Sequence, residues 1–108
     1  MIPTLHNLFN TSPTSDNEEF FTLLEGNRFR LEHIISQGEA SPPDFWYDQE
    51  EPEWVALLAG EAELQFDGGE ALSMKSGDYL LIPAGMKHRV ESTSVDAIWL
   101  ALHFAENE

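Results

Sequence analysis

The sequence predicts an all-β fold, either a sandwich or a barrel. Candidate strands recur about every ten residues, and clusters of glycine, proline and polar residues separate them. In the clearest strands, residues 28–36 and 61–66, apolar and polar side chains alternate, which is the pattern of a strand with one buried face. Short, regularly spaced strands with turns between them are typical of both architectures.

The first 27 residues are expected to form an N-terminal segment that packs on the barrel, and residues 28–105 to form the barrel itself. Residues 10–17 have the composition of a loop. The acidic and amide residues at 16–19 would cap one short helix, which Gly26 would end. A strand over the same residues is the alternative.

The rest of the chain divides into strands and turns. In the 28–36 strand, His33 lies on an apolar face opposite Arg30 and Glu32, and is either structural or turned toward an internal cavity. In the last strand, Trp99 and His103 share a face with two alanines, and we expect that face to line a cavity. The alternative is that both faces of that strand are core. The other expected strands are 45–49, 54–58, 61–66, 72–74, 79–82, 88–92 and 97–104, with a hairpin turn at 67–69.

Length and composition indicate one globular domain. The chain has 108 residues, and 42% of them are hydrophobic, which is enough for one packed core. The formal net charge of −15 disfavours nucleic acids and anionic membrane surfaces as partners. The sequence contains no cysteine, no secretory leader pattern and no membrane-spanning apolar run. We therefore expect a soluble cytoplasmic protein.

The stretch from Gly77 to His88 carries the most specific pattern of the chain. It follows the spacing G-x5-P-x-G-x2-H, in which an apolar strand ends at a corner formed by Pro83 and Gly85, and a histidine opens the next strand. This pattern resembles the second motif of the cupin superfamily. The resemblance implies a double-stranded β-helix, or jelly roll, built around a pocket. Because small cupins often dimerise through their sheet faces, it also implies a homodimer.

The first cupin motif is matched only at its end. In metal-binding cupins this motif contains two histidines followed by a glutamate, six further residues and a glycine. Here Glu53 and Gly60 have that spacing. The two histidine positions fall on Tyr47 and Gln49, or on Trp46 and Asp48 with the longer form of the motif.

The resemblance therefore gives an altered set of candidate metal ligands. Glu53 and His88 match the family's ligands, and Gln49 and Asp48 are the candidates to complete the set. Neighbouring residues of a strand point to opposite faces, so only one of Gln49 and Asp48 would enter the pocket unless a bulge redirects the other. Such a set would hold one divalent transition metal (Mn, Fe, Ni or Zn) weakly. The alternative is a jelly roll that binds an organic ligand without a metal.

The same pocket is the expected ligand site. Its polar anchors would be His88 and Glu53, and its remaining ligand-binding residues would be Trp46, Tyr47, Trp99 and His103. The aromatic cluster at 45–47 is alternatively a dimer interface.

We favour a small-molecule-binding protein. Three alternatives stay open at this point. One is a metal-dependent isomerase, dioxygenase or lyase. Another is a metal-free acid–base catalyst in which His88 carries the proton and Glu53 is its partner. The last is a regulatory or assembly role.

Overall fold

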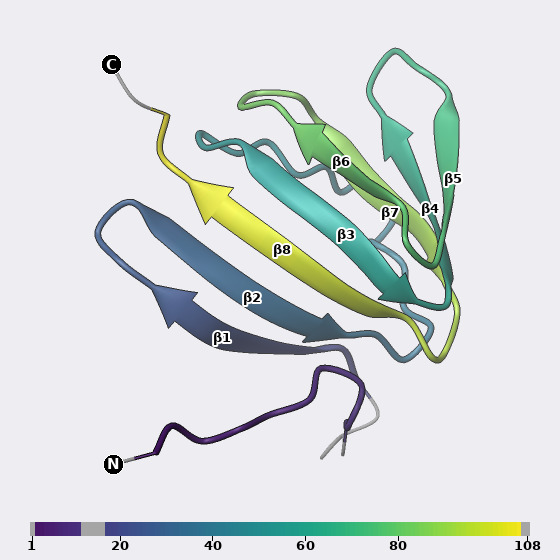
Figure 1. Cartoon of the computed structure of the whole chain (residues 1–108). Coiled ribbons are helices and arrows are strands. Elements are labelled where there is room, and N and C mark those ends of the chain that lie inside the picture. The colour runs from purple at the N-terminus through teal and green to yellow at the C-terminus, as the bar shows by residue number, and fades with distance from the viewer. Residues whose placement is uncertain (1, 12–16, 107–108) are drawn as a thin grey trace.

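The computed structural model describes residues 2–11 and 17–106, and within these ranges it contains eight strands and no helix (Figure 1). None of the described residues belongs to a helix long and apolar enough to cross a membrane. The strands are β1 (Glu19–Glu25), β2 (Phe29–Ile35), β3 (Glu53–Ala59), β4 (Glu61–Phe66), β5 (Ala71–Lys75), β6 (Tyr79–Ile82), β7 (His88–Thr93) and β8 (Ile98–Phe104).

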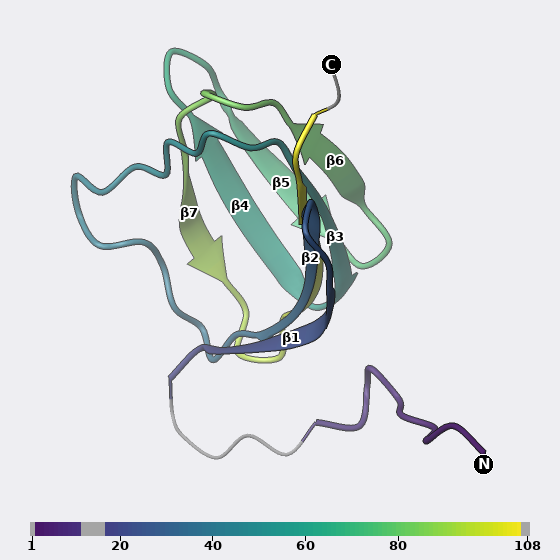
Figure 2. The ribbon, with the colours of Figure 1, turned by 90° about the vertical axis from the view of Figure 1, so that its left-hand side faces the viewer.

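The strands form two antiparallel sheets. The five-stranded sheet has the order β1-β2-β8-β3-β6, and the three-stranded sheet has the order β5-β4-β7. Figure 2 shows the smaller sheet beside the larger one, with the long connection between β2 and β3 running outside β7. This arrangement is a jelly roll, so the predicted all-β class and fold are confirmed.

The segment that was a candidate helix is the edge strand β1. It pairs antiparallel with β2, from Glu19 opposite Ile35 to Glu25 opposite Arg30. Two phenylalanines and a threonine favour a strand here, and the edge of β2 offers backbone partners on both sides of a register shift between Thr22 and Leu24. The helix expectation was therefore wrong, and the strand alternative holds. Residues 12–16, which contain most of the expected loop and the start of the capping signal, lie outside the described residues.

The aromatic strand expected over 45–49 is not formed. Residues 36–52 run as an irregular segment that makes one isolated β-bridge, between Tyr47 and His88. The prolines at 42 and 43 have no amide hydrogen, and Asp44 after them has a left-handed φ of 64°. A regular ladder does not continue through such a turn, so the sequence pattern of a strand was overridden by the backbone chemistry before it.

The core lies between the two sheets. In β4, the inward side chains of Ala62 and Leu64 are buried, whereas Glu61 and Glu63 are exposed, as the alternation predicted. The buried cluster draws on both sheets and contains Val55, Leu57, Ala62, Leu64, Met74, Ile82, Ala97, Trp99 and Ala101.

Gly60 forms the tight reversal between β3 and β4, where the chain passes from one sheet to the other. Its φ is 84°, in the left-handed region. A Cβ atom at this position would lie 2.8 Å from Cα of Ala97, which is too close for any side chain. The reversal therefore requires glycine, and it fixes how the two sheets meet.

Candidate functional site

A cavity of about 400 Å³ lies between the sheets. Its wall is formed by β1, β2, β3, β6, β7 and β8, by β4 through one leucine, and by the 36–52 segment. The apolar lining residues include Phe20, Ile34, Val55, Leu64, Ile82, Val90 and Trp99, and the polar ones include Glu18, Arg30, Glu32, Glu39, Ser41, Tyr47, Gln49, Glu53, His88 and His103.

The register of the five-stranded sheet sets four lining side chains in one row. Arg30 of β2 is opposite His103 of β8, His103 is opposite Glu53 of β3, and Glu53 is opposite Ile82 of β6. Residues that are opposite each other on neighbouring strands point to the same face of a sheet. The backbone therefore holds a cation, an imidazole and a carboxylate side by side.

The next row of the sheet leaves space for the cavity. Glu32 is opposite Ala101, and Ala101 is opposite Val55. Ala101 is completely buried but small, so it fills little of the volume in front of it. The side chain of Glu32 approaches His103, with 3.3 Å between Oε1 and Nε2.

Glu53 lies between two imidazoles at the centre of the site. Its Oε1 is 3.8 Å from Nε2 of His88, and its Oε2 is 3.9 Å from Nε2 of His103. Only 13% of the Glu53 side chain is exposed, yet both distances are longer than a hydrogen bond. The carboxylate therefore keeps acceptor capacity that no described residue uses.

His88 is held on three sides, which leaves one nitrogen for the cavity. Its Nδ1 lies 3.0 Å from the carbonyl oxygen of Met86, and because a carbonyl only accepts, Nδ1 carries a proton. The ring of Tyr47 stacks on it with 5.3 Å between centroids, and the ring of Phe66 lies 6.1 Å away. Nε2 faces Glu53 and has no hydrogen-bond partner among the described residues.

The surroundings of the row shift the pKa values of Glu53 and His103, and each shift favours the uncharged form of its group. Burial raises the pKa of Glu53 to about 7, and the Glu32 carboxylate adds to this while Arg30 opposes it. Burial also lowers the pKa of His103, and Arg30 lowers it further, whereas Glu32 works in the opposite direction. A carboxyl group with a pKa near 7 is able both to give and to take a proton at neutral pH.

Two further carboxylates face the same cavity from other elements. Glu18 precedes β1 and accepts a hydrogen bond from the hydroxyl of Ser36 at 3.0 Å. Burial raises the pKa of Glu18, the Ser36 hydrogen bond lowers it, and the carboxylate of Glu39 raises it again. Burial likewise raises the pKa of Tyr47, and the charges of Glu18 and Glu53 add to that shift. Negative charge from three elements thus converges on one cavity.

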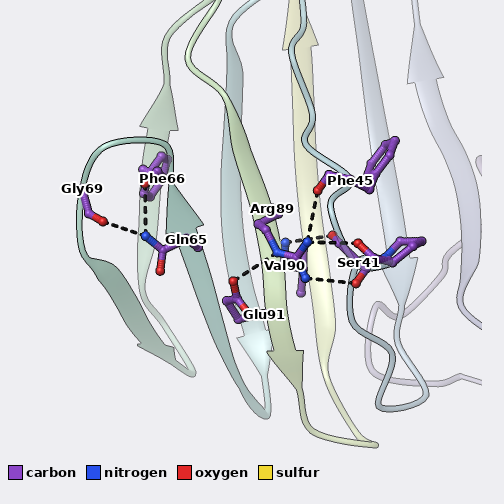
Figure 3. A network of polar contacts seen from close by, with 9 residues as sticks. Ser41, Phe45, Gln65, Phe66, Gly69, Arg89, Val90 and Glu91 are labelled. Carbon is purple, nitrogen blue, oxygen red and sulfur yellow. Dashed lines mark hydrogen bonds and ion pairs between the residues drawn. The ribbon is translucent and has the colours of Figure 1, made fainter.

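Arg89 of β7 fixes the part of the wall that comes from residues 36–52. Its guanidinium donates to the carbonyl oxygens of Ser41 at 3.2 Å, Pro42 at 3.0 Å and Phe45 at 3.3 Å. Figure 3 shows Ser41 and Phe45 beside the side chain of Arg89. The irregular segment is therefore tied to a strand, which gives it the defined position that a regular ladder would otherwise supply.

The cavity collects most of the residues predicted for the site, and their roles remain predictions. Trp46 and Asp48 are the exceptions, because they are absent from its described lining and Asp48 is exposed. Gln49 does line it, as the opposite directions of neighbouring extended residues require. The predicted residues that line the cavity are Tyr47, Gln49, Glu53, His88, Trp99 and His103.

His33 faces away from the cavity, so the structural alternative holds for it. Its Nε2 is buried without a partner among the described residues. Burial lowers the pKa of His33, and a hydrogen bond with the backbone of Leu8 opposes that shift. The inward face of β2 is the other one, which carries Arg30 and Glu32.

Sequence reasoning missed four charged lining residues: Glu18, Arg30, Glu32 and Glu39. A signal was available for two of them. Arg30 and Glu32 have opposite charges and share a strand face, and they form an ion pair with 3.1 Å between Nε and Oε2. Residues two apart on a strand point to the same face, so such a pair can lie either on a solvent-exposed face or on a face that lines a polar cavity.

The lining residues do not fit the metal that the cupin motifs imply. Among the described residues, no three histidine, aspartate or glutamate side chains converge closely enough to hold an ion. Two of the family's four ligand positions are Tyr47 and Gln49, and the Tyr47 ring is engaged in stacking on His88. Of the expected donors, Glu53, His88 and Gln49 line the cavity and Asp48 does not, so only one of the two neighbouring candidates enters it, as expected.

Comparison with known proteins agrees with the fold and the motif. A family model described as a cupin domain matches residues 31–103, which is more than half of the chain. The chain therefore belongs to the cupin family. No curated protein matches it.

Solved structures extend the similarity to nearly the whole chain. A protein of Ralstonia eutropha JMP134, which carries the provisional name mannose-6-phosphate isomerase, is 40% identical with a TM-score of 0.90, and the alignment covers 96% of this chain and 100% of that one. A cupin superfamily protein of Desulfitobacterium hafniense DCB-2 is 16% identical with a TM-score of 0.76, over 98% and 94% of the two chains. KdgF of a Halomonas species is 12% identical with a TM-score of 0.72, over 89% and 87%. The last two similarities show the fold alone.

Proposed function

We propose that this protein binds a small polar molecule in the cavity between its sheets, with Glu53 and His88 as polar anchors. The observation that carries the proposal is the position of Glu53, a buried carboxylate between two imidazoles that accepts no hydrogen bond from the described residues. A buried polar group without hydrogen bonds lowers stability. A ligand in the cavity would supply the missing bonds, and Tyr47 and Trp99 would contact its apolar part.

Thermal-shift and calorimetric titration with a panel of polar metabolites tests this proposal. We expect at least one compound to raise the melting temperature by binding the folded state. The effect should be lost in His88→Ala and in Glu53→Gln. It should persist in Glu70→Gln, which removes a carboxylate from the exposed turn between β4 and β5. Ligands that bind equally well to both cavity variants would overturn the proposal.

A second candidate is a sugar-phosphate isomerase. It is favoured by the 40% identity to the Ralstonia protein with that provisional name and by the near-neutral pKa of Glu53, about 7, which suits proton transfer with His88 as partner. Against it, Arg30 is the only lysine or arginine in the described lining, and Glu32 already pairs with it. The assay is loss of mannose 6-phosphate followed by NMR, with Glu53→Gln as the inactive control.

We also propose that the protein is a cytoplasmic homodimer that associates through the outer face of the five-stranded sheet. Support comes from the outward side chains of β8, which are all apolar, and from Tyr79 and Leu81 of β6, which are 66% and 53% exposed. Apolar sheet faces are normally covered. Light scattering should give twice the chain mass for the wild type and one chain mass for Leu81→Asp, and cell fractionation tests the compartment.

A further inference from the structure

The charges around the cavity are unbalanced. Arg30 is the only lysine or arginine in the described lining, and its Nε lies 3.1 Å from Oε2 of Glu32, so its charge is already matched. Glu18, Glu39 and Glu53 also line the cavity, and no lysine or arginine of the described lining remains to pair with them. The cavity therefore carries an excess of negative charge.

The carboxylates oppose one another's ionisation. After burial, the charge of Glu39 contributes to the raised pKa of Glu18, and the charge of Glu32 contributes to that of Glu53. Like charges held together in a partly desolvated space are costly unless a positive group joins them. The cavity thus has room and charge for a cation that the described protein side chains do not provide.

His88 indicates which kind of cation would fit. His88 is only 5% exposed. Because Nδ1 donates to the carbonyl oxygen of Met86, Nε2 of the neutral imidazole presents a lone pair to the cavity. A lone pair accepts a hydrogen bond from an N–H group, whereas phosphate and carboxylate oxygens only compete with it. The aromatic residues Tyr47 and Trp99 belong to the same lining, and aromatic rings attract cations that approach a free face.

We propose, on the basis of the proposed function, that the ligand is a small organic cation with a primary amine in its ammonium form. Nε2 of His88 and the carboxylate of Glu53 accept hydrogen bonds from the ammonium group. Glu18 and Glu39, which line the same cavity, balance its charge. Sugar phosphates and organic acids are excluded by the same carboxylates, which separates this chain's ligand from the one that the Ralstonia protein's name suggests.

Two matched sets of probes test the charge preference by calorimetric titration at pH 7. One set is benzylamine, benzyl alcohol and benzoate, and the other is mannosamine, mannose and mannose 6-phosphate. In at least one set, we expect the amine to bind about tenfold or more tightly than the neutral member, and the anion not to bind, because charge-assisted hydrogen bonds are the stronger ones. The affinity of the amine should fall as salt is added. An anion or a neutral probe that binds as tightly as its amine overturns the proposal, as does the failure of both amines to bind.

Isosteric Glu→Gln variants test whether the carboxylates of the cavity cause the preference for the amine. Glu18→Gln and Glu39→Gln should each lower the ratio of amine affinity to neutral-probe affinity, by about tenfold or until the two affinities are equal. Glu70→Gln should leave this ratio unchanged. The ratio of the two affinities is measured within one variant, so a partial loss of folding cancels. An unchanged ratio in both cavity variants overturns the proposal.

His88→Ala separates this inference from the proposed function. If a neutral or anionic probe binds and His88→Ala abolishes the binding, the proposed function stands and the cation preference falls. If the amine binds His88→Ala as tightly as the wild type, both fall. Loss of amine binding in His88→Ala, together with the ratio changes above, supports both.

Discussion

The ring of Tyr47 stacks on the ring of His88, with 5.3 Å between centroids and 22° between planes, and two backbone hydrogen bonds of 2.7 and 3.0 Å join the same two residues. The contact serves two purposes at once. It orients the imidazole whose Nε2 faces the cavity, and it attaches the irregular 36–52 segment to β7.

We therefore predict that Tyr47→Leu lowers the free energy of unfolding by about 1 kcal/mol, the usual contribution of a ring pair, and weakens ligand binding. Tyr47→Phe keeps the stacking and removes only the hydroxyl, so its stability should match that of the wild type. Urea denaturation followed by circular dichroism measures both. Equal losses in the two variants would mean that the hydroxyl, not the stacked ring, is what matters.

Replacement of Arg89 should loosen the cavity wall. Arg89→Ala removes the guanidinium that donates to the carbonyl groups of Ser41, Pro42 and Phe45. We expect a loss of about 2 kcal/mol together with faster hydrogen exchange at the Tyr47 amide. The matched control is Glu91→Gln, which breaks only the ion pair between Arg89 and Glu91.

That control should cost less than about 0.5 kcal/mol because the Glu91 side chain is 38% exposed and solvent screens the pair. Exchange at Tyr47 should also stay slow in it. If Glu91→Gln accelerates exchange as much as Arg89→Ala, the carbonyl contacts are not what holds the segment.

The raised pKa of Glu53 predicts a stability that falls with pH. Between its ordinary value of 4.5 and about 7, the folded state binds this proton more tightly than the unfolded state does, so unfolding is favoured as the pH rises. The loss is about 3 kcal/mol at most and is complete above pH 7. Measured against Glu53→Gln, the wild type should therefore lose stability from pH 4.5 to 7 and run parallel to it at higher pH. Parallel curves over the whole range would contradict the shift.

Alanine substitution at two left-handed glycines separates backbone strain from steric overlap. Gly60 and Gly68 have φ values of 84° and 78°, but only Gly60 would place a Cβ against backbone, 2.8 Å from Cα of Ala97. Gly68→Ala should cost about 1 kcal/mol for the dihedral alone, and Gly60→Ala about 3 kcal/mol or more. Chemical denaturation of both variants gives the difference, and equal values would show that the sheets yield at the Ala97 contact.

Elemental analysis tests the metal assignment. Protein expressed in metal-replete medium and purified without chelator should hold much less than one transition metal per chain, because its donors do not converge. The double variant Tyr47→His/Gln49→His restores the family's histidine pair at two cavity-lining positions and should gain a metal. About one metal per wild-type chain, lost in His88→Ala, would overturn this expectation.

The fold was predictable because its signals are local. The Pro83–Gly85 corner and the alternation in β4 and β8 each report on a few neighbouring residues, and the structure has the strands and turns that they indicate. The secondary structure of the segment that forms β1 could not be predicted from local signals. Its helix and strand alternatives differ mainly in whether β2, further along the chain, is available as a partner.

The candidate site was predictable where a motif or a strand period pointed into the cavity. Glu53 and His88 came from motif spacing, and Trp99 and His103 came from the period of the last strand. Glu18 and Glu39 could not be found this way, since they lie outside regular strands and reach the cavity only through the long-range meeting of separate elements.

The row formed by Arg30, His103, Glu53 and Ile82 has a consequence for how this protein can change over generations. Each position is set by backbone pairing between neighbouring strands, so a replacement side chain would point to the same face of the sheet. A single replacement at Ile82, at the end of the row, would put a new functional group beside Glu53. Because Ile82 belongs to the buried core, a new chemical preference gained there would come at the expense of stability.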